Sequence, residues 1–173
     1  LVLTLNSLTI QLSFFAVILA SFYPLMKRYT YFPQMILGAA FAWAIPMAFA
    51  AVKGEVIYVS WVLYISTLLW VLAYDTLYGM VDREDDIKLG LKSTAILFGE
   101  SDLVIVGAIQ GLFITGMFLV GRQLELGIYY YLGLFAALGL ILMQLYRCKS
   151  RKTDEYFRAF LNNNYVGLVI FAG

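Results

Sequence analysis

The sequence contains no histidine, and Cys148 is its only cysteine. These two absences exclude an internal disulfide and a cluster of thiolate metal ligands, and they remove the commonest general base. Charged residues are also scarce: Asp, Glu, Lys and Arg make up 13% of the 173 residues, against about 25% in an average soluble domain. Any chemistry must therefore use carboxylates, lysine, arginine, tyrosine, asparagine or backbone groups.

Hydrophobic residues make up 62% of the chain and occur in long blocks. A helix needs about 20 mostly apolar residues to cross a hydrocarbon layer of about 30 Å. A membrane β-barrel would instead show segments of about 10 residues with alternating polarity, and the blocks here are longer and apolar throughout. The sequence therefore predicts an all-α, polytopic transmembrane helix bundle, with residues 1–173 as a single helical domain.

We expect five nearly complete spans with a partial one at each end. The five spans cover residues 7–24, 34–52, 59–80, 103–120 and 126–146. Residues 1–6 are interpreted as the tail of a truncated helix. Residues 162–173 are interpreted as the start of a sixth span, whose three amides cap it or face a site: Asn162, Asn163 and Asn164. The first residue is not methionine and the last lies in an apolar run, which suggests a fragment truncated at both ends.

Basic residues are distributed unequally between the loops. Lys53 and Arg122 lie in the second and fourth loops. Ten others follow the first, third and fifth spans: Lys27, Arg28, Arg83, Lys88, Lys92, Arg147, Lys149, Arg151, Lys152 and Arg158. Cytoplasmic loops carry an excess of lysine and arginine. We therefore expect these loops to lie in the cytoplasm. The expected surroundings are the lipid bilayer of a bacterial inner membrane, and no nucleic-acid partner is expected.

An acidic stripe at the end of the third span carries the main chemical signal. At about 100° per residue, Asp75, Asp82 and Asp86 share one face if the helix continues through Asp86. Like charges at this spacing destabilise a helix, and a carboxylate in an apolar span is unfavourable. A divalent cation would offset both effects, and Mg²⁺ is commonly held by one or two carboxylates and a substrate phosphate. We predict Asp82 and Asp86 as Mg²⁺ ligands; the alternative is a solvated acidic loop.

Tyrosine and lysine side chains near the stripe are candidate partners of a diphosphate. Lys27, four residues after Tyr23, could contact an anion held by the metal, or could extend to the interface as an ordinary lysine. Lys88 and Lys92 could grip phosphate, or could simply solvate their loop. Asp75 could act as a metal or water ligand, or could have a structural partner.

These residues also form patterns seen in a known family. The pattern of Asp75, Tyr78, Asp82 and Asp86 resembles the second aspartate-rich motif of the UbiA-type intramembrane prenyltransferases. The Tyr-x-x-x-Lys pattern that ends at Lys27 resembles another signature of that family. Residues 23–29, 73–99 and 162–167 are similar to the branch that acts on 4-hydroxybenzoate, so the resemblance covers nearly the whole chain.

The resemblance implies nine transmembrane helices around a central cavity, of which this chain holds the end of the third through most of the ninth. The family's first aspartate-rich motif is absent and is expected upstream, so the chain alone is predicted to be inactive. The implied reaction, part of ubiquinone biosynthesis, is Mg²⁺-dependent transfer of a polyprenyl group from polyprenyl diphosphate to 4-hydroxybenzoate. In this interpretation a group of four residues binds the diphosphate: Tyr23, Lys27, Lys88 and Lys92. Asp75 and Tyr78 are candidate catalytic residues that orient water, substrate or the proton acceptor.

Three alternatives stay open at this point. A related prenyltransferase could use a different aromatic acceptor. A membrane cation transporter is a different class, but its carboxylates are expected near the bilayer midplane on several helices, whereas these crowd at one helix end. A structural subunit without a site leaves the acidic stripe uncompensated.

Overall fold

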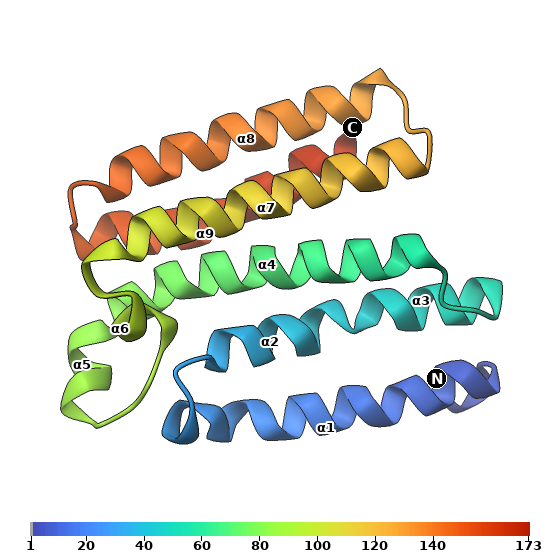
Figure 1. Cartoon of the computed structure of the whole chain (residues 1–173), viewed down its shortest axis with the longest axis horizontal. Coiled ribbons are helices and arrows are strands. Elements are labelled where there is room, and N and C mark those ends of the chain that lie inside the picture. The colour runs from blue at the N-terminus through green and yellow to red at the C-terminus, as the bar shows by residue number, and fades with distance from the viewer. Residues whose placement is uncertain (1) are drawn as a thin grey trace.

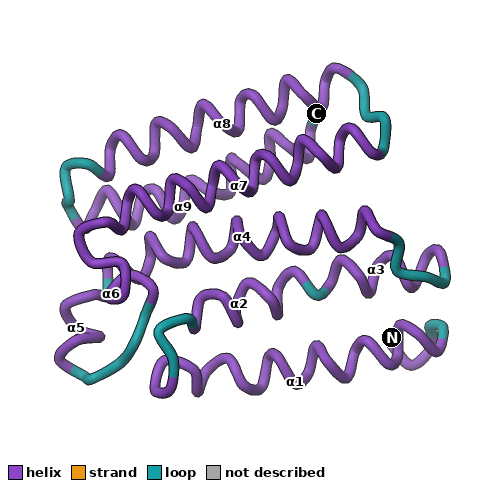
Figure 2. Tube along the Cα trace, in the orientation of Figure 1, coloured by secondary structure: helices purple, strands orange, loops and turns teal. Residues whose placement is uncertain are grey.

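The structure is a computed structural model that describes residues 2–173, and every regular element in that range is a helix (Figure 1, Figure 2). The predicted all-α class is confirmed. The long helices are α1 (Ser7–Tyr29), α2 (Pro33–Ala42), α3 (Ala44–Lys53), α4 (Tyr58–Val81), α7 (Asp102–Gln123), α8 (Ile128–Cys148) and α9 (Thr153–Ala172). The short ones are the 3₁₀ turns η1 (Val2–Thr4) and η2 (Gly99–Ser101) and the helices α5 (Arg83–Lys88) and α6 (Thr94–Phe98).

The long helices lie side by side along one axis, and α5 and α6 lie together at one end of them (Figure 1). Five helical segments are long and apolar enough to cross a membrane: Ser7–Tyr29, Pro33–Lys53, Tyr58–Val81, Thr94–Gln123 and Ile128–Cys148. The first four segments contain the predicted spans, and the fifth is shifted two residues toward the C-terminus of the predicted one. The first and fourth segments are clearly longer than predicted, because α1 continues past Pro24 and the fourth segment includes α6.

The structure corrects the predicted limits at three places. Residues 2–6 do not form the predicted helix tail, because η1 is one short turn. Asn6 caps α1 by accepting a hydrogen bond from the Thr9 backbone N–H at 2.9 Å. Leu1 lies outside the described residues. The second span breaks at Trp43, because Pro46 has no N–H to donate one turn back. Helix α9 begins at Thr153, so the amides expected to cap it lie inside it.

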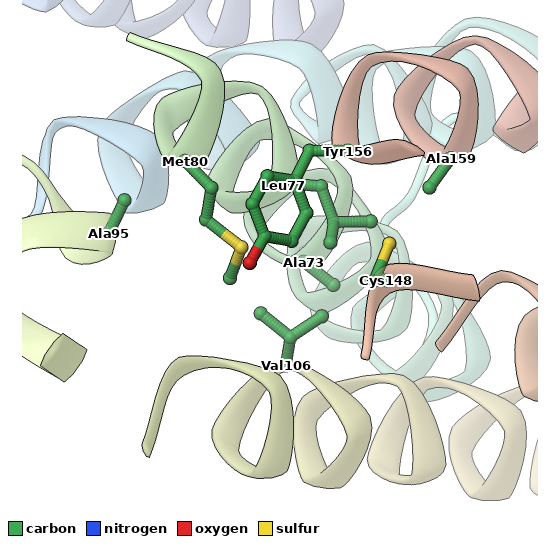
Figure 3. Close-up of a cluster of buried hydrophobic side chains, with 8 residues drawn as sticks. All are labelled: Ala73, Leu77, Met80, Ala95, Val106, Cys148, Tyr156 and Ala159. Atoms are coloured by element: carbon green, nitrogen blue, oxygen red, sulfur yellow. The ribbon is translucent and has the colours of Figure 1, made fainter. Parts of the chain in front are cut away.

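Helix α4 forms the centre of the core. At the end nearest α5, buried side chains from five helices meet in a cluster of Ala73, Leu77, Met80, Ala95, Val106, Cys148, Tyr156 and Ala159 (Figure 3). Farther along, α4 packs so closely on α7 that a Cβ added at Gly116 would overlap the Ser66 hydroxyl. Small residues allow such close approach between membrane helices. Close packing against α7, α8 and α9 therefore fixes the position of the α4 backbone.

Helix α1 is held more loosely. Among its residues, all of which the structure describes, only Thr9 is buried. Polar contacts attach it to the second span: the Trp43 indole N–H donates to the Leu12 carbonyl at 2.9 Å, and the Asn6 amide donates to the Ala50 carbonyl at 2.6 Å. The position of α1 therefore depends on a few directed hydrogen bonds.

Candidate active site

One end of the bundle collects the polar loops. Helices α1 and α8 end there, and α5 and α9 begin there (Figure 1). The ten basic residues counted above therefore gather at that end, while Lys53 and Arg122 lie at the ends of α3 and α7 on the opposite side. The unequal distribution predicted from the sequence is a property of the fold.

The acidic segment does not continue as a single helix. Helix α4 ends at Val81, Asp82 is its C-terminal cap, and α5 begins at Arg83, so the predicted continuation through Asp86 is wrong. Negative charge is unfavourable at a helix C-terminus and favourable at an N-terminus. After the break, Glu84, Asp85 and Asp86 lie in the first turn of a new helix, where negative charge is favourable. This charge preference explains why α4 ends before them.

The fold brings Lys27 and Asp86 together from positions 59 residues apart. The Lys27 ammonium donates to both carboxylate oxygens of Asp86, at 3.1 and 3.2 Å. Asp86 is buried, while one third of the Lys27 side chain is exposed. The main chain supports the contact, because the Lys92 N–H donates to the Lys27 carbonyl at 2.8 Å. The sequence predicts that Lys27 contacts an anion held by the metal, whereas in the structure it pairs with a predicted metal ligand itself.

Asp82 lies at the centre of this group and is partly buried. Burial raises the pKa of its carboxyl above the ordinary value, the Lys27 ammonium lowers it, and the carboxylates of Asp86 and Asp85 raise it. A cation bound beside Asp82 would favour its ionised form. Asp75 lies deeper along α4 and is within electrostatic range of Lys27 and Asp82.

Tyr23 extends the site along α1. It is within electrostatic range of both Asp75 and Lys27. Tyr23 and Lys27 of α1 are thus both close enough to Asp75 for their charges to interact with it. No hydrogen bond from Tyr23 is found within residues 2–173.

The other two predicted lysines make different contacts. Lys88 donates to Asp85 at 3.0 Å, and both side chains are largely exposed. The Lys92 ammonium donates to the Tyr29 carbonyl at 3.3 Å and lies 5.4 Å from the centre of the Tyr31 ring. Neither ammonium contacts Asp82 or Asp86 in the described structure. Lys92 instead connects the loop after α5 to the end of α1.

The donor set suits a hard cation. Asp82 and Asp86 offer carboxylate oxygens on consecutive turns, and Mg²⁺ is typically held by one or two carboxylates while phosphate and water complete its shell. Within residues 2–173 no three acidic or thiol side chains converge on one point. Asp82 and Asp86 could therefore hold a cation only together with further oxygen ligands.

An aromatic wall leads away from the carboxylates along α4 and α9. The Tyr78 ring lies 5.0 Å from that of Phe160, which lies 5.9 Å from that of Tyr74. Beside them is a cavity of about 340 Å³, lined by Trp70, Tyr74, Phe160, Leu161, Asn163 and Asn164. The wall is apolar apart from its amides, so it suits a hydrocarbon or aromatic group.

Sequence reasoning missed the α9 part of this wall. Phe157 and Phe160 fall in a stretch interpreted as a charged loop. The available signal was helical spacing, since Tyr156, Ala159, Asn163 and Val166 are all buried on one face. Asn163 accepts a hydrogen bond from the Trp70 indole N–H at 3.1 Å and donates to the Ala159 carbonyl, so its amide faces the helix core.

Fold and site together define an integral membrane helix bundle with a lysine-paired acidic site at one end. Residues 1–164 match the UbiA prenyltransferase family, and the chain belongs to that family. Over all 173 residues it is 57% identical to a 4-hydroxybenzoate octaprenyltransferase of Nitrosococcus oceani and 54% identical to one of Alkalilimnicola ehrlichii. It spans 61% and 59% of their lengths.

Solved structures agree on the fold. The apo structure of a UbiA homologue from Aeropyrum pernix superposes with a TM-score of 0.81 at 21% identity, covering 99% of this chain and 66% of that one. A digeranylgeranylglyceryl phosphate synthase structure gives 0.77 at 17% identity, covering 98% of this chain and 61% of that one. The bundle is thus a UbiA-like arrangement of helices.

Proposed function

We propose that a protein of the relatives' length carrying this chain transfers a polyprenyl group from polyprenyl diphosphate to 4-hydroxybenzoate, as a step of ubiquinone biosynthesis. The observation that carries the proposal is the pairing of Lys27 with Asp86 beside Asp82. It places a cation and two carboxylates at the mouth of an apolar bundle, which is what an amphiphilic diphosphate requires. The names of the most similar relatives support the octaprenyl donor and this acceptor.

Asp82 and Asp86 would hold Mg²⁺ through their carboxylate oxygens. When bound, that ion neutralises charge on the departing diphosphate. Lys27 pairs with Asp86, and its partly exposed side chain would contact the diphosphate of a bound substrate. Tyr23 lies beside Lys27 on the same helix and completes this side of the subsite. Lys88 and Lys92 stay predictions without a supporting contact.

The aromatic wall would exclude water from the reacting allylic group. Tyr78 packs against Phe160, and Phe160 lines the cavity between α4 and α9. An allylic cation reacts quickly with water, so a dry surface protects it until the acceptor ring attacks. Asp75 and Tyr78 are the residues proposed to orient the acceptor or receive its proton.

The same proposal includes the surroundings of the enzyme. The basic end of the bundle would face the cytoplasm, in a bacterial inner membrane. Residues 1–173 alone would be inactive, because the relatives extend beyond the matched three-fifths and the other metal motif is expected in that remaining part.

The test measures prenyl transfer in membranes by a protein that contains this chain and is as long as its curated relatives. The assay contains octaprenyl diphosphate, Mg²⁺ and labelled 4-hydroxybenzoate. We expect octaprenylated 4-hydroxybenzoate, and loss of product when EDTA is added. Naphthoate and homogentisate serve as competing acceptors. Preferential labelling of either one would replace the acceptor in this proposal, and no labelled product with any acceptor would contradict prenyl transfer itself.

A further inference from the structure

Asp102 is a completely buried carboxylate outside the site described above. It is the first residue of α7. Its Oδ2 accepts hydrogen bonds from Arg83 and, at 3.3 Å, from Arg151. Its Oδ1 accepts one from the Leu103 backbone N–H at 2.6 Å. Asp102 has no exposed surface, and three donors from different residues hold its two oxygens, so it acts on its neighbours and not on a ligand.

The two arginines come from different parts of the chain. Arg83 directly follows Asp82 and begins α5. Arg151 lies in the loop between α8 and α9, has a positive φ of 54°, and also donates to the Glu100 carbonyl at 2.8 Å. A single carboxylate thus joins the end of α4, the start of α7 and the start of α9.

Helix α5 has little packing of its own to fix its direction. Asp86 is its only buried residue, and Ile87 is 57% exposed. Two ion pairs hold the helix: Arg83 with Asp102 at its start, and Asp86 with Lys27 one turn later. The direction in which α5 leaves α4, and with it the spacing of the two candidate metal ligands, therefore depends on these pairs.

We propose that Asp102 is a positioning residue: through Arg83 it sets the orientation of Asp82 and of α5, so that the carboxylates of Asp82 and Asp86 face one cation. The inference rests on the proposed function for the identity of the metal site. Arg83 donates to Asp102 through one terminal nitrogen, Nη2, and its buried Nε has no partner within residues 2–173, so this one ion pair sets where the guanidinium lies. Asp102 therefore fixes the junction at which α4 stops and α5 begins.

Arg151 provides an internal control, because it binds the same carboxylate oxygen but belongs to a loop that does not carry the site. If the cluster only stabilises the fold, loss of either arginine should have the same consequence. If Asp102 positions the site, loss of Arg83 should weaken metal binding and loss of Arg151 should not.

The experiment compares Asp102→Asn, Arg83→Gln and Arg151→Gln in the protein of full relative length, purified in detergent. Mn²⁺ binding is measured by EPR in the presence of inorganic diphosphate, and the Mg²⁺ concentration for half-maximal prenyl transfer is measured in parallel. Loss of a residue that orients a metal ligand typically weakens metal binding about 10–100-fold. We expect Asp102→Asn and Arg83→Gln to weaken Mn²⁺ binding by at least about tenfold, and Arg151→Gln to bind Mn²⁺ like the wild type.

Equal shifts in the two arginine variants, or wild-type Mn²⁺ affinity in Arg83→Gln, would overturn the inference. If Asp102→Asn gives no monodisperse protein by size-exclusion chromatography, Arg83→Met takes its place, since it removes the hydrogen bond to Asp102 and leaves that carboxylate with Arg151. Unchanged Mn²⁺ affinity in that folded variant also overturns the inference. Wild-type protein that binds Mn²⁺ but prenylates no acceptor refutes the proposed function alone, because the Mn²⁺ measurement still decides the role of Asp102.

Discussion

Helices α4 and α1 flank the candidate site, and they differ sharply in how they are held. Ten residues of α4 are buried, from Val59 to Met80, whereas α1 buries only Thr9. Asp75 and Asp82 thus lie on or at the end of the helix with many buried residues, while Asp86 follows in α5 and its partner Lys27 lies on the helix with one buried residue. The site therefore lies between α4, which is positioned by extensive packing, and α1, which is positioned by individual polar contacts.

The largest effect is expected on the α4 side. In the protein of full relative length, Asp82→Asn or Asp86→Asn should lower prenyl transfer at least about 1000-fold, about 4 kcal/mol of transition-state stabilisation, because each removes a proposed Mg²⁺ ligand. Asp85→Asn is the matched control, since that carboxylate is largely exposed and pairs only with Lys88. Turnover assays in isolated membranes measure this. Near-wild-type activity in Asp82→Asn would remove it from the metal site.

A second prediction sharpens the contrast from the α1 side. Lys27→Met should lower kcat/KM for the diphosphate substrate by about 100-fold, about 2.7 kcal/mol, because it leaves buried Asp86 without its counter-charge. Lys88→Met should change it less than about threefold, since an exposed pair contributes little. The sequence predicts diphosphate binding by both lysines, whereas in the structure Lys27 contacts Asp86 and Lys88 contacts only the exposed Asp85. Equal losses in the two variants would contradict the structural distinction.

The tight packing of α4 can be tested without touching the site. Gly116→Ala should lower the free energy of unfolding by about 1–3 kcal/mol, because the new methyl group would overlap Ser66 on α4. Gly111→Ala on the same helix meets nothing within 4 Å and should be neutral or stabilising by up to about 1 kcal/mol. Denaturant unfolding in detergent measures both. A neutral Gly116→Ala would show that α4 and α7 can separate slightly without loss.

The smallest effect is expected where α1 is attached. Trp43→Phe removes the hydrogen bond to the Leu12 carbonyl and should cost about 1 kcal/mol of stability, with faster hydrogen exchange confined to α1. Trp61→Phe is the control, because its ring contacts Trp43 but its indole donates no hydrogen bond within residues 2–173. Equal exchange in both variants would indicate that ring packing, and not this bond, holds α1.

Much of the fold followed from local pattern, because apolar blocks and basic loops report directly on membrane spans. The spacing of Asp82 and Asp86 also predicts a common metal site, which stays a prediction. The break between α4 and α5 did not follow, since it depends on the charge balance at a helix end that the pattern alone leaves ambiguous. The aromatic wall was hidden because Phe157 lies among charged residues. The pairing of Arg83 with Asp102 could not be foreseen, since both look like ordinary loop charges until the chain folds.

Helix α9 joins the bundle through a polar contact as well as through apolar packing. The Asn163 side-chain oxygen accepts a hydrogen bond from the Trp70 indole N–H of α4 at 3.1 Å, and its amide nitrogen donates to the Ala159 carbonyl. In a hydrocarbon environment an amide finds no water to bond, so it favours the helix pairing that satisfies it. Asn163 therefore specifies the register between α4 and α9, because sliding one helix along the other by a turn would separate its oxygen from the indole N–H.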